Sequence, residues 1–195
     1  MEQKIELKPY PKRLIVLPNG DEMIVAQQTK DEIEEVADAL LPNVKYHQDF
    51  FDLVNSEIIM ELYLWRENRT IWGCPPESHF NLVGRVDGEI VGVTNGVLRD
   101  QTTGCSLHTT TLKRGLQIGA YLWPCKLEHY FDVLEADRVE ASAESQIGSR
   151  KLFVAYGFQP QPFPQQKSHF GTQLQVMTRS QWQRIKSGKL MGERI

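Results

Sequence analysis

The stretch with the clearest chemical potential runs from Arg114 to Ala120 and contains Gly115 and Gly119. It lies between an expected strand, 105–112, and an expected helix. Glycine lets the backbone come close to a ligand because it has no Cβ, and the first amides of a helix have no partner within the helix. Such amides, with the positive end of the helix dipole, suit a pyrophosphate. A plain tight turn uses the same glycines, so this stretch alone leaves both interpretations open.

The composition excludes other kinds of site. Of the 195 residues 41% are hydrophobic and 24% are charged, and the net charge is -3 at pH 7. These values are ordinary for a globular protein, and a mildly acidic chain lacks the basic surface that nucleic-acid binding needs. Cys74, Cys105 and Cys125 form no CxxC pair, so we expect neither a disulfide framework nor a metal site. We interpret Cys105 as a half-buried thiol rather than an acyl carrier.

Targeting signals are not visible in the sequence. The first residues lack the apolar run of a signal peptide, and no window approaches the ~18 apolar residues of a membrane span. We therefore expect a cytoplasmic protein with no membrane partner.

The first elements follow from turn and capping signals. Apolar runs at 14–17 and 23–27 flank Asn19-Gly20, which predicts a hairpin. Thr29 and Glu32 form a capping box for a helix. Its apolar residues recur at helical spacing: Ile33, Val36, Ala37 and Leu40.

A second helix is expected from about His47 to Arg66. Its apolar stripe consists of Phe51, Val54, Ile58, Leu62 and Trp65. We interpret Trp65, Trp72 and Phe80 as core aromatics rather than the lining of a pocket.

The rest of the chain predicts a hairpin over 80–97, the strand 105–112, and a helix in which Pro124 bends or delays the start. A strand over 138–143, a helix over 148–156, a strand from Phe158 and a last strand over 173–177 follow. Ser180 with Gln183 suggests a capped terminal helix. This order predicts a mixed sheet with helices packed on it.

Two blocks carry a resemblance to a known family. Arg114-Gly115-Leu116-Gln117-Ile118-Gly119-Ala120 resembles the Arg/Gln-x-x-Gly-x-Gly/Ala signature of the GNAT superfamily of acyl-CoA N-acyltransferases, with Gln117 in place of the usual first glycine. The segment 149–158, which ends in Gly157-Phe158, is similar to the family's helix that ends in Gly-Phe. The resemblance covers roughly 80–177.

The resemblance implies a single α/β domain over 1–195. It has a central, largely antiparallel sheet with a V-shaped splay between the fourth and fifth core strands, and helices on both faces. We expect an N-terminal hairpin (13–28), acceptor-side helices (29–70), a CoA-binding core (79–178) and a terminal helix (180–188).

The resemblance also implies acetyl-CoA as co-substrate. The strand 107–112 would pair with the pantetheine arm through main-chain groups, and the loop amides would hold the pyrophosphate. The implied cofactor-binding residues are Thr109, Thr110, Thr111, Leu112, Arg114, Gly115, Leu116, Gln117, Ile118, Gly119, Ala120, Gln146, Ser149 and Phe153.

Two departures from the family's pattern bear on catalysis. The family often has a tyrosine acid where this chain has Phe153, which cannot donate a proton. The family's helix asparagine corresponds to Gln146. The resemblance therefore supports CoA binding more strongly than turnover.

Three residues are candidates for the general base. His108 is the first, because it lies on the strand beside the expected thioester and an imidazole titrates near neutral pH. A half-buried strand histidine with a backbone partner is the structural alternative. Glu144, at the end of the next strand, is the second candidate, and His169, in a Pro- and Gln-rich loop, is the third.

We hypothesise an N-acetyltransferase that moves an acetyl group to a primary amine of a small molecule or protein in a ternary complex. One alternative is a CoA- or acyl-CoA-binding regulatory or interaction module without turnover, and another is a plain interaction domain. Oligomeric state stays open, with a homodimer as the default.

Overall fold

The computed structural model describes residues 5, 7–44, 53–142, 146–161 and 174–195 of the chain. Its strands are β1 (Arg13–Val16), β2 (Glu22–Gln27), β3 (His79–Val86), β4 (Glu89–Leu98), β5 (Thr103–Thr111), β6 (Arg138–Ser142), β7 (Gln159–Pro160), β8 (Leu174–Thr178) and β9 (Glu193–Arg194). Its α-helices are α1 (Ile33–Leu40), α2 (Leu53–Arg66), α3 (Ile118–Glu128), α4 (Gln146–Arg150) and α5 (Arg179–Ile185). Wider π-helical turns continue α3 over His129–Val133 and α4 over Lys151–Ala155.

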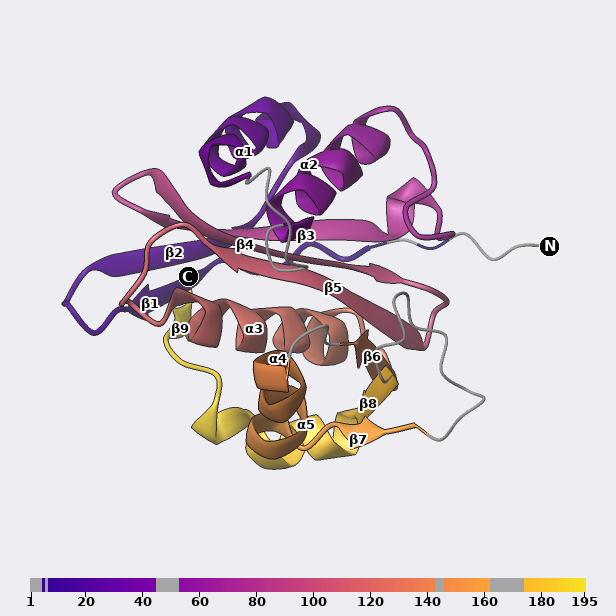
Figure 1. Ribbon diagram of the computed structural model, residues 1–195. Coiled ribbons are helices and arrows are strands. Elements are labelled where there is room, and N and C mark those ends of the chain that lie inside the picture. The colour runs from indigo at the N-terminus through magenta and orange to yellow at the C-terminus, as the bar shows by residue number, and fades with distance from the viewer. Residues whose placement is uncertain (1–4, 6, 45–52, 143–145, 162–173) are drawn as a thin grey trace.

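One sheet of mixed direction organises the described residues. Its strand order is β7-β8-β6-β5-β4-β3-β2-β1-β9. Helices α1 and α2 cover one face, and α3, α4 and α5 cover the other (Figure 1). The expected α/β fold with helices on both faces is confirmed. No helix within the described ranges has both the length and the apolar composition to cross a bilayer.

The N-terminal hairpin and the first helix form as predicted. β1 and β2 pair antiparallel, with Arg13 opposite Val25, and Gly20 adopts a φ of 91° in the turn. The capping box is present, since the backbone N–H of Thr29 donates to Glu32 at 2.7 Å. The apolar side of α1 is buried on the sheet.

The two faces of the sheet carry separate apolar cores. Ile58, Leu62 and Trp65 of α2 lie in the core above the sheet with the buried residues of α1. Phe80 lies in the core below it with residues of α3 and α5. Full burial of each such side chain contributes ~1.5–3 kcal/mol relative to exposure. The predicted stripe of the second helix is confirmed for these three residues, whereas Phe51 lies outside the described residues.

β5 and β6 pair over only part of their length. They run parallel, and the pairing goes from Thr103 opposite Arg138 to Ser106 opposite Ala141. β5 continues to Thr111 beyond this paired segment, with β4 as its partner on the other side. The V-shaped splay stays a prediction, and the end of the pairing at Ser106 is where it would begin.

β5 contains a bulge directly after the point where its pairing with β6 ends. Thr94 of β4 lies opposite Thr109, and Gly96 lies opposite Ser106. Asn95 therefore faces two residues of β5, Leu107 and His108. A bulge changes which side of the sheet a side chain faces. Leu107 packs on the core of α1 and α2, and His108 contacts α2 as well.

Two details of the sequence-based expectation are wrong, the delayed start of the helix at Pro124 and the cap of the terminal helix, and one strand was not predicted. α3 begins at Ile118, so Pro124 does not delay its start and lies well inside the helix, where it lacks the N–H for an intrahelical bond. The terminal helix is capped by Thr178 with Gln181 rather than by Ser180 with Gln183. After it, the chain adds β9 at the edge of β1, a short strand that its sequence did not signal.

Candidate functional site

His108 forms the chemical centre of the site through contacts with α2. Its Nε2 lies 3.2 Å from Oε1 of Glu61 and 3.5 Å from Oε2 of Glu57. A carboxylate only accepts hydrogen bonds, so Nε2 carries the hydrogen in the contact with Glu61. This fixes the neutral tautomer and leaves Nδ1 of His108 as the proton acceptor. The side chain of His108 keeps 13% exposure.

Glu61 is a fully buried carboxylate with several donors. Nδ2 of Asn95 donates to Oε2 of Glu61 at 2.5 Å, and Nε1 of Trp72 donates to Oε1. A buried charge is tolerated only where partners satisfy it. Asn95 lies on β4 and Trp72 lies in the loop after α2. Because the two donors reach Glu61 from different elements, they hold its carboxylate in one orientation.

Burial and pairing oppose each other in setting the pKa values of this pair. Burial lowers the pKa of His108, and the hydrogen bond and charge of Glu61 with the charge of Glu57 outweigh it, so the pKa is raised. Burial raises the pKa of Glu61, and the hydrogen bond and charge of His108 outweigh it, so the pKa is lowered. The arrangement therefore stabilises an imidazolium next to a carboxylate, as a carboxylate–histidine pair in an acid–base site does.

His108, the first candidate base from the sequence, lies on β5 as expected. The sequence-based prediction did not include its partners, Glu57 and Glu61. Glu144 and His169, the second and third candidates, lie outside the described residues. Trp72 is not the core residue we expected. Its side chain is 39% exposed, and it donates to Glu61. Trp65 and Phe80 are buried, as expected.

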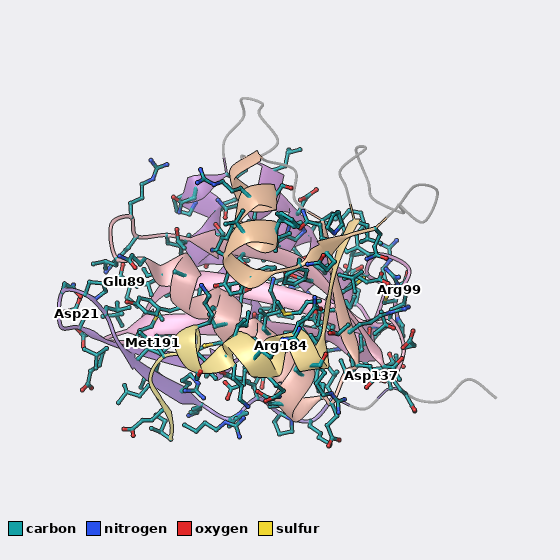
Figure 2. The ribbon with its side chains drawn as sticks, turned by 90° about the horizontal axis from the view of Figure 1, so that it is seen from below. Asp21, Glu89, Arg99, Asp137, Arg184 and Met191 are labelled. Carbon is teal, nitrogen blue, oxygen red and sulfur yellow. The ribbon has the colours of Figure 1, made fainter. Side chains whose placement is uncertain are left out.

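The glycine turn lies at the other end of β5. β5 ends at Thr111, and at ~3.3 Å per residue the three strand positions from His108 to Thr111 span ~10 Å. Gly115 has a φ of 85°. Lys113 pairs with Glu89 at 2.7 Å, which ties the turn to the end of the sheet where Figure 2 places Glu89.

Gln117 occupies the place of the usual first signature glycine in an unusual backbone conformation. It is the N-cap of α3, with φ 56° and ψ 21°, the left-handed region. A glycine adopts this region without strain, whereas other residues pay ~1–2 kcal/mol. The backbone geometry that the signature glycine would allow is therefore kept here at a cost in strain.

Most amides of the turn have no backbone partner among the described residues. Within the described part of the chain, the N–H of Ala120 donates to Gln117 at 2.8 Å, and no backbone acceptor is observed for the amides of 115–119. Gly119 packs close to β5, because a Cβ at this position would lie 3.2 Å from Cγ2 of Thr111. The amide of Ala120 thus has a backbone partner, and the role of 115–120 in holding a diphosphate stays a prediction.

The remaining predicted cofactor residues surround the same strand. Thr110 donates to Asn55 of α2 at 2.8 Å, and Thr109 shares a 2.6 Å hydrogen bond with Thr94. The backbone N–H of Leu112 is taken by Val91 of β4. Ile118 is buried, Leu116 packs partly buried on the lower core, and Arg114 is exposed.

Helix α4 and its continuation carry the last predicted residues. Ser149 accepts a hydrogen bond from Gln175 at 2.9 Å, and the side chain of Gln146 is not described. Phe153 is 51% exposed and Tyr156 is buried, so they face different directions, as expected. Burial raises the pKa of Tyr156, which makes it a poor substitute for the family's tyrosine acid.

Cysteine and metal chemistry receive no support from the described residues. Cys105 is half-buried, and burial raises the pKa of its thiol to about 11, so it is a weak nucleophile. No three His, Cys, Asp or Glu side chains gather there as a metal ion would need.

Comparisons with known proteins define the fold. No protein-family model and no curated protein sequence matches the chain. Mycobacterium smegmatis RimJ in complex with CoA-disulfide matches with a TM-score of 0.56 and 14% identity, over 93% of this chain and 96% of that one. The GNAT domain of S. lividans PAT gives a TM-score of 0.57 and 13% identity, over 86% of this chain and 96% of its own.

A third solved structure contains the acetyl donor. Campylobacter jejuni N-acetyltransferase PseH in complex with acetyl coenzyme A matches with a TM-score of 0.51 and 13% identity, over 80% of this chain and 98% of that one. At such low identity these likenesses show the fold alone. The chain has the fold of the GNAT acetyltransferases, as the two sequence blocks indicated.

Proposed function

We propose that this chain is an acetyl-CoA-dependent N-acetyltransferase that acetylates a primary amine of a small molecule or protein within a ternary complex. The observation that carries the proposal is the pair formed by Glu61 of α2 and His108 of β5, close to the point where the pairing of β5 with β6 ends. A bound thioester and an amine would meet at this point. The fold and the free amides of the glycine turn support the same reading.

His108 would act as the general base. An amine arrives largely as its ammonium ion, and Nδ1 of His108 would take one proton so that the nitrogen lone pair can attack the thioester carbonyl. Glu61 would stabilise the resulting imidazolium. The C–N bond forms as the C–S bond breaks, the nitrogen passes its second proton to the departing sulfur, and CoA leaves as the thiol. A thiol pKa of ~8.5 makes this leaving group acceptable without a strong acid, which is compatible with Phe153.

The donor would bind along β5. The amides of 115–119 and the charge of Arg114 would hold the diphosphate. Backbone groups of Thr109–Thr111 on the side away from β4 would pair with the pantetheine arm as an added strand. Gln146, Ser149 and Phe153 would lie beside it on the α4 side.

The alternative of a CoA-binding module without turnover is favoured by Phe153 and by the lack of a carboxylate on β5. The structure supplies two carboxylates from α2, Glu57 and Glu61, next to His108. This favours an enzyme over a binding module.

The direct test is release of free CoA thiol from acetyl-CoA in the presence of a panel of amines: polyamines, amino sugars, amino acids and peptides. The proposal expects amine-dependent thiol release with at least one class, and a thermal shift with acetyl-CoA of ~2.7 kcal/mol stabilisation at 100 times Kd. A thermal shift without release by any amine would support the binding module. Neither signal would favour a plain interaction domain.

The pair predicts a defined pH dependence. The pKa of His108 is raised above its usual value, so the fraction of unprotonated base, and with it kcat/KM, should increase as pH rises through this raised pKa. Glu61→Gln removes the hydrogen bond and charge that raise the pKa while burial, which lowers it, remains. We expect the acidic limb of the kcat/KM profile to move to lower pH, with a lower plateau.

The free energy of unfolding should also depend on pH through this pair. Because the pKa of His108 is raised in the folded state, the stability that His108 contributes is complete below its unfolded pKa and is lost as pH rises through its folded pKa. The pKa of Glu61 is lowered, so the stability that Glu61 contributes is lost as pH falls through its folded pKa. Glu77→Gln, on an exposed acid, is the matched control for both measurements. An acidic limb that stays in place in Glu61→Gln would show that His108 is not the titrating base.

A further inference from the structure

Lys126 is a buried lysine that the proposed chemistry does not use. It lies on α3, on the opposite side of the sheet from Glu61, and is 0% exposed. Burial lowers its pKa well below the usual range. A buried ammonium is costly unless every donor finds an acceptor, so its partners indicate what it does.

All three acceptors of Lys126 belong to the bulge between β4 and β5. Its Nζ donates to the carbonyl of His108 at 3.0 Å, to the carbonyl of Asn95 at 3.2 Å and to Oγ1 of Thr109 at 3.2 Å. Nζ also lies 4.3 Å from the centre of the Trp123 ring. The two carbonyls are those of the residues that face each other across the bulge.

The bulge leaves ladder groups that need replacement partners. The N–H of His108 donates to the side-chain Oδ1 of Asn95 at 2.8 Å rather than to a strand carbonyl, and the carbonyls of Asn95 and His108 accept from Lys126. The carbonyl of His108 also accepts from Oγ1 of Thr94 at 3.2 Å. Asn95 therefore holds the bulge from the α2 side and Lys126 holds it from the α3 side.

The bulge decides where His108 points. In a regular strand successive side chains alternate between faces, so Leu107 and His108 would lie on opposite sides of the sheet. The extra residue places both on the α2 side, where Nε2 of His108 reaches Glu61. Loss of the bulge would turn the imidazole away from its carboxylate.

We propose that Lys126 is a positioning residue: from the far side of the sheet it holds the β5 bulge that directs His108 to Glu61. Its kinetic consequence rests on the proposed function, whereas the position of the imidazole is a property of the free protein. The two can therefore fail separately.

The test replaces Lys126 by methionine, which keeps most of the volume and removes the donors. Its matched control is Leu127→Ala, which removes buried atoms from the same helix without touching the bulge. The readout is the titration and tautomer of the His108 imidazole by nitrogen-15 NMR in the ligand-free full chain. The groups that act on this ring are Glu57 and Glu61 on α2, His79 on β3 and Lys126 itself.

The sign of the result separates the possible roles. The charge of Lys126 lowers the pKa of His108, and Glu61 raises it. If Lys126 positions the ring, Lys126→Met separates His108 from Glu61, so the pKa falls and the Nε2–H tautomer loses its preference. If Lys126 acts only through its charge, the pKa rises. An unchanged or raised pKa in a folded variant overturns the proposal.

Two further readouts complete the test. Under the proposal kcat falls ~10–100-fold in Lys126→Met while the acetyl-CoA Kd stays unchanged, because small misplacements of a reacting group are costly, and Leu127→Ala keeps its kcat per folded molecule. If Lys126→Met does not fold, Thr109→Ser and Thr109→Val are compared by NMR. Serine keeps the acceptor and should retain the His108 pKa, whereas valine removes it and should lower the pKa. Equal titrations in these two variants would also contradict the proposal.

Discussion

His108→Gln is expected to lower kcat by ~10²–10⁴-fold, the range that a lost general base usually costs. Glutamine keeps a side chain of similar length that can still donate to Glu61, but it has no group that can take a proton near neutral pH. Because the acetyl donor would bind mainly through backbone amides of the glycine turn and β5, its affinity should not change. Rapid-quench or steady-state kinetics with the best amine, with calorimetric Kd values for acetyl-CoA, measure both quantities.

The control for His108→Gln is to compare its effect on kcat with its effect on the Kd for acetyl-CoA. A parallel loss of both would mean that His108 shapes the donor site rather than acting on the amine. Turnover at the wild-type level in a folded His108→Gln variant would remove His108 as the base and direct attention to Glu57 or to residues outside the described ranges.

Gly119→Asp is expected to weaken acetyl-CoA binding by ~10–100-fold, which corresponds to ~1.4–2.8 kcal/mol of charge repulsion at a partly solvated site. Gly119 is the second residue of α3, so a carboxylate here lies next to the amides that would hold the diphosphate. An acid in the first turn of a helix stabilises the free protein by ~0.3–1 kcal/mol. The predicted signature is therefore weaker binding by a protein that is at least as stable.

Gly119→Ala separates charge from bulk at the same position. Its Cβ would lie 3.2 Å from Cγ2 of Thr111, a tight contact that a small side-chain movement relieves, and alanine favours the helix over glycine. Most of the affinity should remain. If Gly119→Asp and Gly119→Ala bind acetyl-CoA equally well, the anion site is not at this turn. Isothermal titration calorimetry and thermal unfolding give the two numbers.

Local signals were sufficient for much of the fold. Asn19-Gly20 between apolar runs fixed the first hairpin, and Thr29 with Glu32 fixed the start of the first helical segment, because these signals act through neighbouring backbone groups. The terminal helix shows the limit of such reasoning. Ser180 and Thr178 are each followed three residues later by a glutamine that can complete a capping box. Thr178 is the cap because β8 ends there and the helix begins at the next residue.

The partners of His108 could not be derived in the same way. Glu61, Asn95 and Lys126 come from three other elements, and sequence spacing says nothing about a contact across 47 residues between Glu61 and His108. One signal was available. Glu61 is three residues after Ile58 and four before Trp65, which places an acid within the apolar stripe of a helix. A charged residue at a buried position needs a partner, and this marks it for attention.

The bulge in β5 is a second feature that the sequence did not predict, and it determines the side of the sheet on which His108 lies. The prediction of a strand through His108 was confirmed, but a regular strand gives no reason to place Leu107 and His108 on one face. The extra residue depends on the side chains of Asn95 and Lys126, which replace the ladder bonds. Gln117 is a comparable case, since its left-handed backbone is set by the turn and not by its own preference.

The decisive measurement is a crystal structure of the chain with bound acetyl-CoA. We expect the diphosphate on the amides between Gly115 and Gly119, the pantetheine arm along β5, and the thioester carbon next to the imidazole of His108. A donor bound at another edge of the sheet, or a thioester far from His108 with these amides facing solvent, would contradict this expectation.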